Sequence, residues 1–188
     1  LPVLAYRPAP VQMSGIGYFA TTGLSAVDYM IGDVWLDGAP AGMRNAPFFT
    51  EKLLALLHTH LCYTPAADAP LPGALPCLAR GFVTFGSFNA FAKASDEALR
   101  AWAQILEAVP ASRLLLKSAA FSSEEGCAAA LARLQAAGVD AARVELRPDT
   151  REYLHEYHDV DIALDSFPYP GGGTTFDALY MGVPVVTL

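Results

Sequence analysis

The hydrophobic pattern of the second half of the chain predicts strands and helices in alternation. Apolar residues at helical spacing behind a polar N-cap predict helices over residues 95–109 and 122–138. Short apolar runs predict strands between them. The strands are expected at 82–85, 113–116, 144–146, 160–164 and 185–188, and further helices at 150–158 and 174–181. This alternation is typical of a parallel sheet with helices on both faces.

The first part of the chain has a different pattern. Residues 18–23 are small and flexible, 26–31 indicate a strand, and 48–63 are of mixed character. Residues 64–76 are rich in Pro, Ala and Asp, a composition that favours loop or polyproline conformations. We therefore expect the end of one α/β lobe at residues 1–65, a linker at 66–80 and a second lobe at 81–188.

Composition narrows the classes of protein to consider. With 53% hydrophobic and 16% charged residues, the 188-residue chain can bury a core. Its net charge of -7 offers no basic surface to nucleic acid, and no apolar run reaches the ~18 residues of a membrane span. The cysteines are widely spaced and odd in number, which argues against a disulfide framework or a zinc site. We expect a cytoplasmic protein, nucleocytoplasmic in a eukaryote, that binds neither nucleic acid nor membrane and holds no metal.

A glycine-rich turn separates the strand expected at 160–164 from the helix that follows it. The turn reads Pro170-Gly171-Gly172-Gly173-Thr174-Thr175. Ligands of parallel sheets bind at the carboxyl ends of strands, where a helix N-terminus offers N–H groups to a phosphate. Thr174 and Thr175 add hydroxyl donors, and Asp177 can accept from ribose hydroxyls. Spacing alone fits a phosphate cradle and a flexible helix-capping turn equally, because glycine-rich motifs often match by chance. Neither the Walker spacing nor G-x-G-x-x-G is present, which argues against a P-loop kinase or a dehydrogenase.

Lys93 belongs to a second loop expected at the same edge of the sheet. It follows the segment Phe85-Gly86-Ser87-Phe88-Asn89 and precedes the cap at Ser95. There its ammonium can neutralise a diphosphate leaving group. A single loop lysine is more often simply solvated, and Asn89 also fits a residue that holds the turn through its own backbone.

Five groups of residues, in one order along the chain, match the motifs of a known family. They are Arg7-Pro8-Ala9-Pro10-Val11-Gln12 with Gly15-Ile16-Gly17-Tyr18; Leu61-Cys62-Tyr63-Thr64-Pro65; Phe85-Gly86-Ser87-Phe88-Asn89 with Lys93; Leu164-Asp165-Ser166-Phe167-Pro168-Tyr169; and Leu179-Tyr180-Met181-Gly182-Val183-Pro184. Over essentially its whole length the chain thus resembles the O-GlcNAc transferase and SPINDLY proteins of glycosyltransferase family 41. The resemblance implies an α/β fold of the two-lobed GT-B type. A Rossmann-like parallel sheet would form the C-terminal lobe, preceded by the end of the N-terminal lobe.

The resemblance also implies roles for individual residues. Lys93 matches the lysine that contacts the donor diphosphate and supports departure of the nucleoside diphosphate. Thr174 matches a phosphate-binding threonine, Asp177 the acid on the ribose, and Tyr153 a ring near the nucleotide base. The rest of the expected donor site is Asn89, Gly171, Gly172, Gly173 and Thr175, and the residues expected to line the sugar and the reaction cleft are Ile16, Gly17 and Tyr169.

The implied activity is inverting, metal-independent transfer of a sugar, GlcNAc first of all, to Ser or Thr hydroxyls of proteins. No cofactor is implied besides the substrate, UDP-GlcNAc or GDP-fucose. The family's tetratricopeptide repeats and the histidines of its N-terminal lobe are expected upstream. The chain looks cut at both ends, so we expect an incomplete enzyme.

Two departures from the family pattern keep alternatives open. Gly172 stands where O-GlcNAc transferases carry a histidine, and Glu156 stands at the position of their base-contacting arginine. The motifs at 61–65 and 179–182 lean towards the SPINDLY branch, whose plant members use GDP-fucose, so one alternative is a protein O-fucosyltransferase. The others are a catalytically silent regulatory or interaction module with the same fold, and another GT-B enzyme such as an epimerase or a small-acceptor glycosyltransferase.

Overall fold

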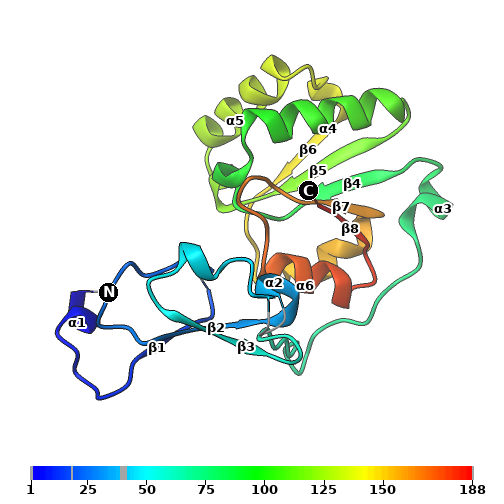
Figure 1. Ribbon diagram of the computed structural model, residues 1–188. Coiled ribbons are helices and arrows are strands. Elements are labelled where there is room, and N and C mark those ends of the chain that lie inside the picture. Colours follow the sequence, from blue (N-terminus) through cyan, green and yellow to red (C-terminus); the bar gives the residue numbers. More distant parts are fainter. Residues whose placement is uncertain (1, 18, 39–41, 188) are drawn as a thin grey trace. The chain divides into compact units, whose positions relative to one another are not determined.

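The chain divides into two compact units, which are described separately (Figure 1). The structure is a computed structural model that describes residues 2–17, 19–38 and 42–187. The units comprise Leu1–Thr64 and Pro65–Leu188. The segment expected as a linker at 66–80 therefore belongs to the second unit, and its last five residues form helix α3 (Pro76–Arg80). Tyr18 of the first motif and Leu188 of the last expected strand lie outside the described residues.

The first unit contains a three-stranded parallel sheet in the order β1-β2-β3. The strand expected at 26–31 begins at Tyr29 instead, because the N–H of Val27 closes a turn on the carbonyl of Leu24. The elements are α1 (Pro2–Ala5), β1 (Met13–Ser14), β2 (Tyr29–Asp33), α2 (Val34–Asp37), the 3-10 helix η2 (Ala46–Phe48) and β3 (Lys52–Leu56).

A buried carboxylate ties the end of β2 to the segment after β3. Asp33 caps α2 by accepting the N–H groups of Trp35 and Leu36. Its other oxygen accepts the backbone N–H of His60 and lies 2.7 Å from Nδ1 of that ring. Burial raises the pKa of Asp33, but the hydrogen bonds from Leu36 and His60 outweigh it and hold that pKa well below its usual range.

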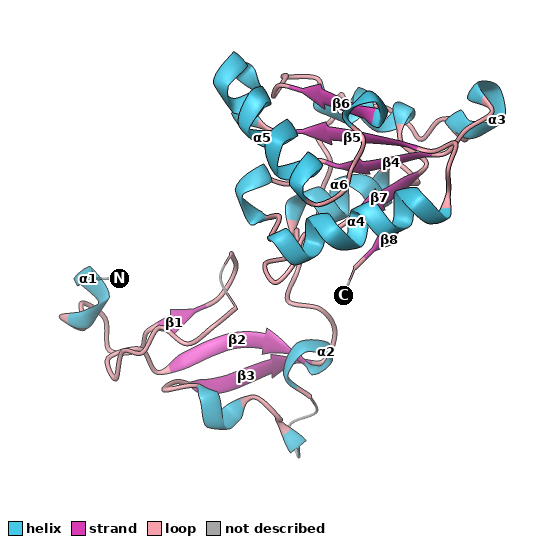
Figure 2. Ribbon diagram, turned by 90° about the horizontal axis from the view of Figure 1, so that it is seen from above, coloured by secondary structure: helices cyan, strands magenta, loops and turns pink. Residues whose placement is uncertain are grey.

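The second unit is built on a five-stranded sheet in which every pair of neighbours is parallel. Figure 2 shows its order, β6-β5-β4-β7-β8. The strands are β4 (Thr84–Ser87), β5 (Arg113–Lys117), β6 (Val144–Arg147), β7 (Ile162–Leu164) and β8 (Val185–Val186). The chain runs outwards from β4 to β6 and then crosses to β7 on the other side of β4. Ligands of doubly wound sheets bind beside such a reversal, at the carboxyl ends of the strands.

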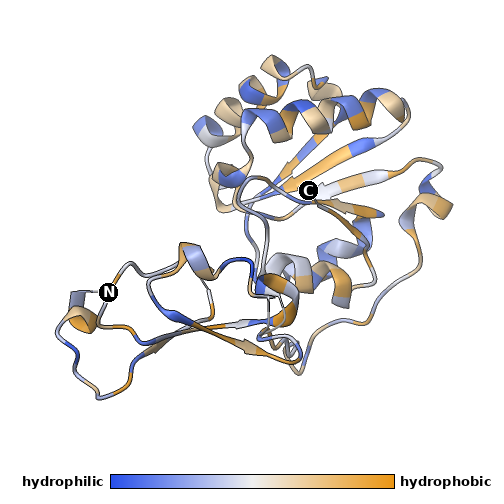
Figure 3. Ribbon diagram, viewed as in Figure 1, coloured by the Kyte–Doolittle hydropathy of each residue, from blue (hydrophilic) through white to orange (hydrophobic). Residues whose placement is uncertain are grey.

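Helices cover both faces of this sheet, as the alternating pattern predicts (Figure 1). Helices α4 (Asp96–Ala108) and α5 (Glu124–Ala136) lie on one face, and α6 (Gly173–Tyr180) with the 3-10 helix η6 (Tyr153–Asp159) on the other. Figure 3 shows hydrophobic and hydrophilic residues on both α4 and α5, as expected of helices with one buried side. Three further 3-10 helices are η3 (Phe91–Lys93), η4 (Ala119–Ser122) and η5 (Ala141–Arg143).

Strand β5 divides the two sides of the core. Leu114 and Leu116 pack with Trp102 of α4 and Leu134 of α5 in one cluster. Because side chains alternate along a strand, Lys117 leaves the strand on the opposite face. That face carries the second cluster, which comprises Tyr157, Val160, Ala163, Ala178, Met181 and Val183.

Two of the expected helices differ from the structure in detail. Ser122 lies in η4, and the residue that caps α5 is Ser123, whose extended backbone lets its hydroxyl accept the N–H of Gly126. The helix expected at 150–158 is the 3-10 helix η6. The hydroxyls of Tyr153 and Tyr157 are both bound to α6, so tertiary contacts decide the form of this segment.

Candidate functional site

A cavity of about 450 Å³ lies at the carboxyl edge of the five-stranded sheet, beside the β4/β7 reversal. Seven of the predicted site residues line it, namely Asn89, Lys93, Tyr153, Gly172, Gly173, Thr174 and Asp177. The other lining residues are Phe88, Ala90, Lys117, Asp149 and Thr150. The segments that follow β4, β6 and β7, together with Lys117 at the end of β5, thus bring polar residues to one place.

Asp165, directly after β7, organises the loop that carries the glycine turn. Its Oδ1 accepts the backbone N–H groups of Ser166 and Gly171, each at 2.8 Å, and the side-chain amide of Asn89 at 3.0 Å. Its Oδ2 accepts the hydroxyl of Thr187 at 3.0 Å. One carboxylate therefore fixes the β7 loop to the loop after β4 and to the end of β8.

Asn89 connects the two loops that form the centre of the site. Its amide donates to Asp165, and its Oδ1 accepts the hydroxyl of Thr174 at 2.7 Å. Its side chain thus holds the first turn of α6. Sequence reasoning could not distinguish this role from that of a residue that merely holds its own turn.

The glycines of the turn differ in their surroundings. A Cβ at Gly171 would lie 2.6 Å from the Thr174 hydroxyl oxygen and 2.9 Å from Asn89 Oδ1, so the close approach of these groups requires glycine. A Cβ at Gly172 or Gly173 would meet nothing within 4 Å. Gly172 is the N-cap of α6 and offers no side-chain cap, so the N-terminal turn of this helix is open to the cavity.

Lys93 supplies positive charge to the cavity. Its ammonium lies 4.6 Å from the centre of the Tyr169 ring, a cation–π contact between two predicted site residues. Among the residues that the structure describes, no carboxylate lies within ion-pair distance of Lys93. Lys93 and the open turn of α6 therefore give the cavity groups that are chemically suited to an anion.

Asp177 and Tyr153 bring a hydrogen-bond acceptor to the lining of the cavity. Asp177, which is buried, accepts the hydroxyl of Tyr153 at 3.1 Å. Burial and the neighbouring Asp177 carboxylate raise the pKa of Tyr153, so this hydroxyl stays protonated and donates. Thr175, in the same turn of α6 as Thr174, brings its hydroxyl within 2.9 Å of the position of a Gly171 Cβ.

Sequence reasoning missed two residues of this region, Asp165 and Lys117. Both lie at the carboxyl end of a strand, where parallel sheets bind their ligands. This position in the chain, which also pointed to the glycine turn, is the signal that could have identified them. Asp165 appeared only as part of a motif, and Lys117 directly follows the strand expected at 113–116. Lys117 is buried and its Nζ lies 2.7 Å from the Glu156 carboxylate.

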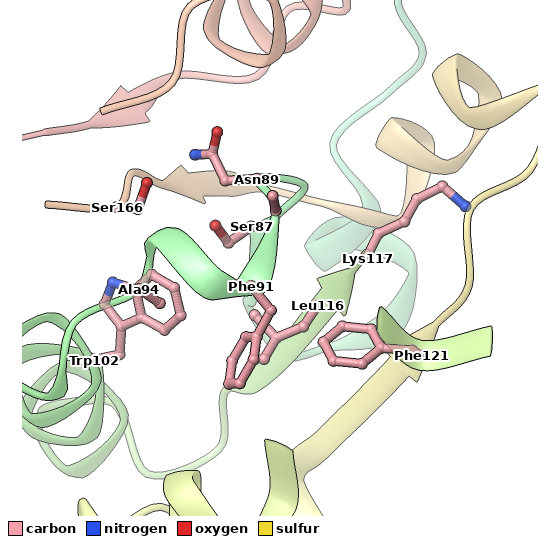
Figure 4. A pocket seen from close by; sticks show the side chains of 10 residues that line it. Ser87, Asn89, Phe91, Ala94, Trp102, Leu116, Lys117, Phe121 and Ser166 are labelled. Atoms are coloured by element: carbon pink, nitrogen blue, oxygen red, sulfur yellow. The ribbon is translucent and has the colours of Figure 1, made fainter. Parts of the chain in front are cut away.

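A second hollow nearby is too small to bind a ligand. Figure 4 shows the ten residues that line it, among them Ser87, Trp102, Phe121 and Ser166. It has no room for a water molecule. It is a packing defect beneath the β4 loop, and the larger cavity is the candidate site.

Ile16 and Gly17 lie in the first unit, whereas all the other predicted site residues lie in the second. Both have left-handed backbone conformations, with φ of 51° at Ile16 and 91° at Gly17, and Ile16 is 81% exposed. This conformation is unfavourable for a β-branched residue, so the loop is strained at Ile16.

No group of three or more His, Cys, Asp or Glu side chains in the described part of the chain is arranged to hold a metal ion. None of the described helices combines the length and the apolar character needed to cross a bilayer.

The fold and the cavity define a class. A doubly wound parallel sheet whose strand order reverses beside a glycine turn, a helix N-terminus and a lysine is the arrangement of Rossmann-like nucleotide-binding domains. Comparison with known families is more specific. Residues 75–188 match the model of glycosyl transferase family 41, and the chain belongs to this family. The predicted family is confirmed.

The relatives are described as protein glycosyltransferases. The chain is 43% identical over its whole length to a probable UDP-N-acetylglucosamine–peptide N-acetylglucosaminyltransferase SPINDLY of Solanum lycopersicum, of which it covers 20%. It is 29% identical to the probable SEC enzyme of Arabidopsis thaliana, over 99% of this chain and 19% of that protein. The chain thus spans about a fifth of the length of these relatives.

A solved structure shows the same fold. A mutant of the Thermobaculum terrenum O-GlcNAc transferase superposes with a TM-score of 0.87 over 98% of this chain and 34% of that one, at 38% identity. The predicted α/β class of GT-B type is confirmed.

Proposed function

We propose that the chain is the donor-binding part of a glycosyltransferase that moves a sugar from a nucleotide-sugar donor to Ser or Thr hydroxyls of proteins. The proposed donor is UDP-GlcNAc, which the names of the plant relatives include. Transfer would be inverting and would use no metal or cofactor. A cytoplasmic location and tetratricopeptide repeats upstream belong to the same proposal.

One observation carries this proposal. A single cavity combines an anion-binding end, made by Lys93 and the open turn of α6, with an acceptor end made by Asp177 and its partner Tyr153. A nucleoside diphosphate needs both, because its phosphates are anionic and its ribose hydroxyls donate hydrogen bonds. We assign the diphosphate to the first end and the nucleoside to the second.

The chemistry that this arrangement supports is departure of the nucleoside diphosphate. As the acceptor oxygen forms its bond to the anomeric carbon, the bond from that carbon to the diphosphate oxygen breaks, and its electron pair leaves with the diphosphate. The proton of the acceptor hydroxyl passes to water or to the departing diphosphate in the same reaction. Lys93 and the α6 N–H groups are placed to stabilise the growing negative charge on the leaving group.

The experiment is a comparison of donors and of lysine variants in the full-length protein. Binding of UDP, GDP, UDP-GlcNAc and GDP-fucose is measured by calorimetry, and sugar transfer to protein is followed by mass spectrometry. We expect Lys93→Met to lower kcat about 100-fold or more, the size seen when one stabiliser of developing charge is removed. Lys52→Met, an exposed lysine of the first unit, is the matched control.

Absence of binding to all four nucleotides would refute the proposed function. Full transfer activity in Lys93→Met would refute the role of Lys93. Binding without any transfer would favour the catalytically silent module, and transfer only to small sugars would favour another GT-B enzyme.

A second candidate is protein O-fucosyl transfer from GDP-fucose. The chain is more similar to SPINDLY, at 43% identity, than to SEC, at 29%. The open position of Gly172 also lacks the histidine expected of O-GlcNAc transferases. Transfer of fucose but not of GlcNAc in the same assay would establish this candidate.

A further inference from the structure

Lys117 is a buried cation at the carboxyl end of β5, and it lines the 450 Å³ cavity. Its side chain is 3% exposed. Figure 4 shows its amine directed away from Leu116, Phe91 and Phe121, towards the segment that follows β6. A buried lysine needs partners for its charge, and here they are all found in that segment.

The ammonium of Lys117 is fully used by the protein. It donates to the carbonyl of Pro148 at 2.5 Å, to the hydroxyl of Thr150 at 3.0 Å and to the Glu156 carboxylate at 2.7 Å. An ammonium has three N–H donors. None is left for a ligand, so Lys117 differs in kind from Lys93, which lines the cavity and has no carboxylate partner among the described residues.

Glu156 completes a closed set of contacts. Its Oε1 accepts from Lys117 and from the Thr150 hydroxyl at 2.5 Å, and its Oε2 lies 3.4 Å from an Arg147 guanidinium nitrogen. Burial raises the pKa of Glu156, but the hydrogen bonds from Lys117 and Thr150 outweigh it and lower that pKa. Glu156 stands where the family resemblance places a base-contacting arginine. Its charge is instead paired with Lys117 within the protein.

These contacts hold residues that shape the nucleoside end of the cavity. Thr150 and Asp149 line it, and Tyr153, which begins η6, donates to Asp177. Pro148, Thr150 and Glu156 lie on either side of Tyr153 in the chain, so one ammonium fixes both the entry to η6 and its middle. Without it, Tyr153 and Thr150 would lose the support that keeps them in place.

We propose that Lys117 is a positioning residue for the nucleoside of the donor: it clamps residues 148–156 so that the cavity is formed before the nucleotide binds. This inference rests on the proposed function. Since the clamp acts on the nucleoside end and not on the leaving diphosphate, it governs donor binding rather than the transfer step.

The test compares two variants of the full-length protein. Lys117→Met removes the ammonium and leaves Glu156 with only Thr150 and Arg147 as partners, whereas Lys117→Met/Glu156→Met removes both members of the ion pair. Calorimetry gives the Kd of UDP and of GDP, and kinetics give KM and kcat. In both variants we expect Kd and donor KM to rise about tenfold, while kcat changes less than about threefold.

The double variant keeps the test decisive if Lys117→Met does not fold, because replacing a buried pair by apolar residues is commonly tolerated. Lys52→Met is the control. A Kd of the double variant within about twofold of the wild type, or a loss of kcat at unchanged Kd, overturns the inference. A wild-type protein that binds neither UDP nor GDP refutes the proposed function itself, and the inference with it.

Discussion

Asp165 shows how one side chain can organise a site without facing the ligand. Three N–H donors from two loops meet at its Oδ1, and a hydroxyl from the end of β8 meets its Oδ2. The glycine turn is thereby held against Asn89 before any nucleotide arrives. The role of Asp165 is to position the groups that surround the cavity.

Substitution of Asp165 tests this role. We expect Asp165→Ala to lower the free energy of unfolding by about 2–3 kcal/mol, because several donors lose their acceptor. Asp165→Asn keeps an oxygen for the three N–H donors and should cost less than about 1 kcal/mol. Urea unfolding measures both. Equal effects of the two substitutions would contradict the hydrogen-bonding account.

The glycines offer a matched pair at the same scale. Gly171→Ala brings a Cβ within 2.6 Å of the Thr174 hydroxyl and should destabilise the protein by about 1–3 kcal/mol and weaken nucleotide binding. Gly172→Ala enters open space and should change stability by less than about 0.5 kcal/mol. Thermal unfolding measures the stability of the two variants, and calorimetry measures their nucleotide binding. A larger effect at Gly172 than at Gly171 would contradict the close contacts described for Gly171.

At the scale of elements, η6 is held by its neighbours on both sides. Lys117 of β5 binds the residues before it and Glu156 within it, and α6 binds the hydroxyls of Tyr153 and Tyr157. Such a segment depends on charge as well as on packing. Its stability should therefore depend on pH.

The lowered pKa of Glu156 fixes the direction of this dependence. A carboxylate whose pKa is lower in the folded state stabilises the protein above its unfolded pKa, ordinarily about 4.5, and loses that contribution as pH falls through the lowered value. Glu156→Gln should therefore cost about 2 kcal/mol at pH 7 and clearly less at pH 3. Urea unfolding at both pH values tests this, with exposed Glu107→Gln as control. An equal cost at both pH values would contradict the ion-pair account.

At the scale of the whole molecule, the net charge of -7 opposes the binding of an anion, so attraction must come from local groups. Lys93 and the open end of α6 provide it in the second unit. The phosphate groups of a nucleotide should therefore contribute more to its binding than the base does.

Thermal shift measurements test this expectation. At 100 times its Kd, a nucleoside diphosphate should stabilise the protein by about 2.7 kcal/mol and raise its Tm. Uridine and guanosine should give a much smaller shift at the same concentration, because they carry nothing for Lys93 to bind. Equal shifts with nucleosides and nucleoside diphosphates would show that the anion end has been wrongly assigned.

Prediction from sequence succeeded where the determinants are local. The strand and helix alternation, the Ser95 cap, the glycine turn and the place of Lys93 all follow from neighbours in the chain, and the structure has them close to the expected positions. It failed at η6, whose form depends on contacts with α6 and β5. It also misplaced the cap of α5 by one residue, since the 3-10 helix η4 takes up Ser122.

The sequence by itself determined the class of fold, the family and the loops that carry the candidate site, because periodicity, caps and motifs are properties of short stretches of chain. Only the tertiary structure decided what those loops do together. It brought Asn89 to Thr174 and Asp165, and Tyr153 to Asp177, across separations that no local pattern encodes. It also separated two lysines that look alike in sequence. Lys93 lines the cavity without a carboxylate partner among the described residues, whereas the charge of Lys117 is bound by the protein, because burial and hydrogen-bond partners are set by folding.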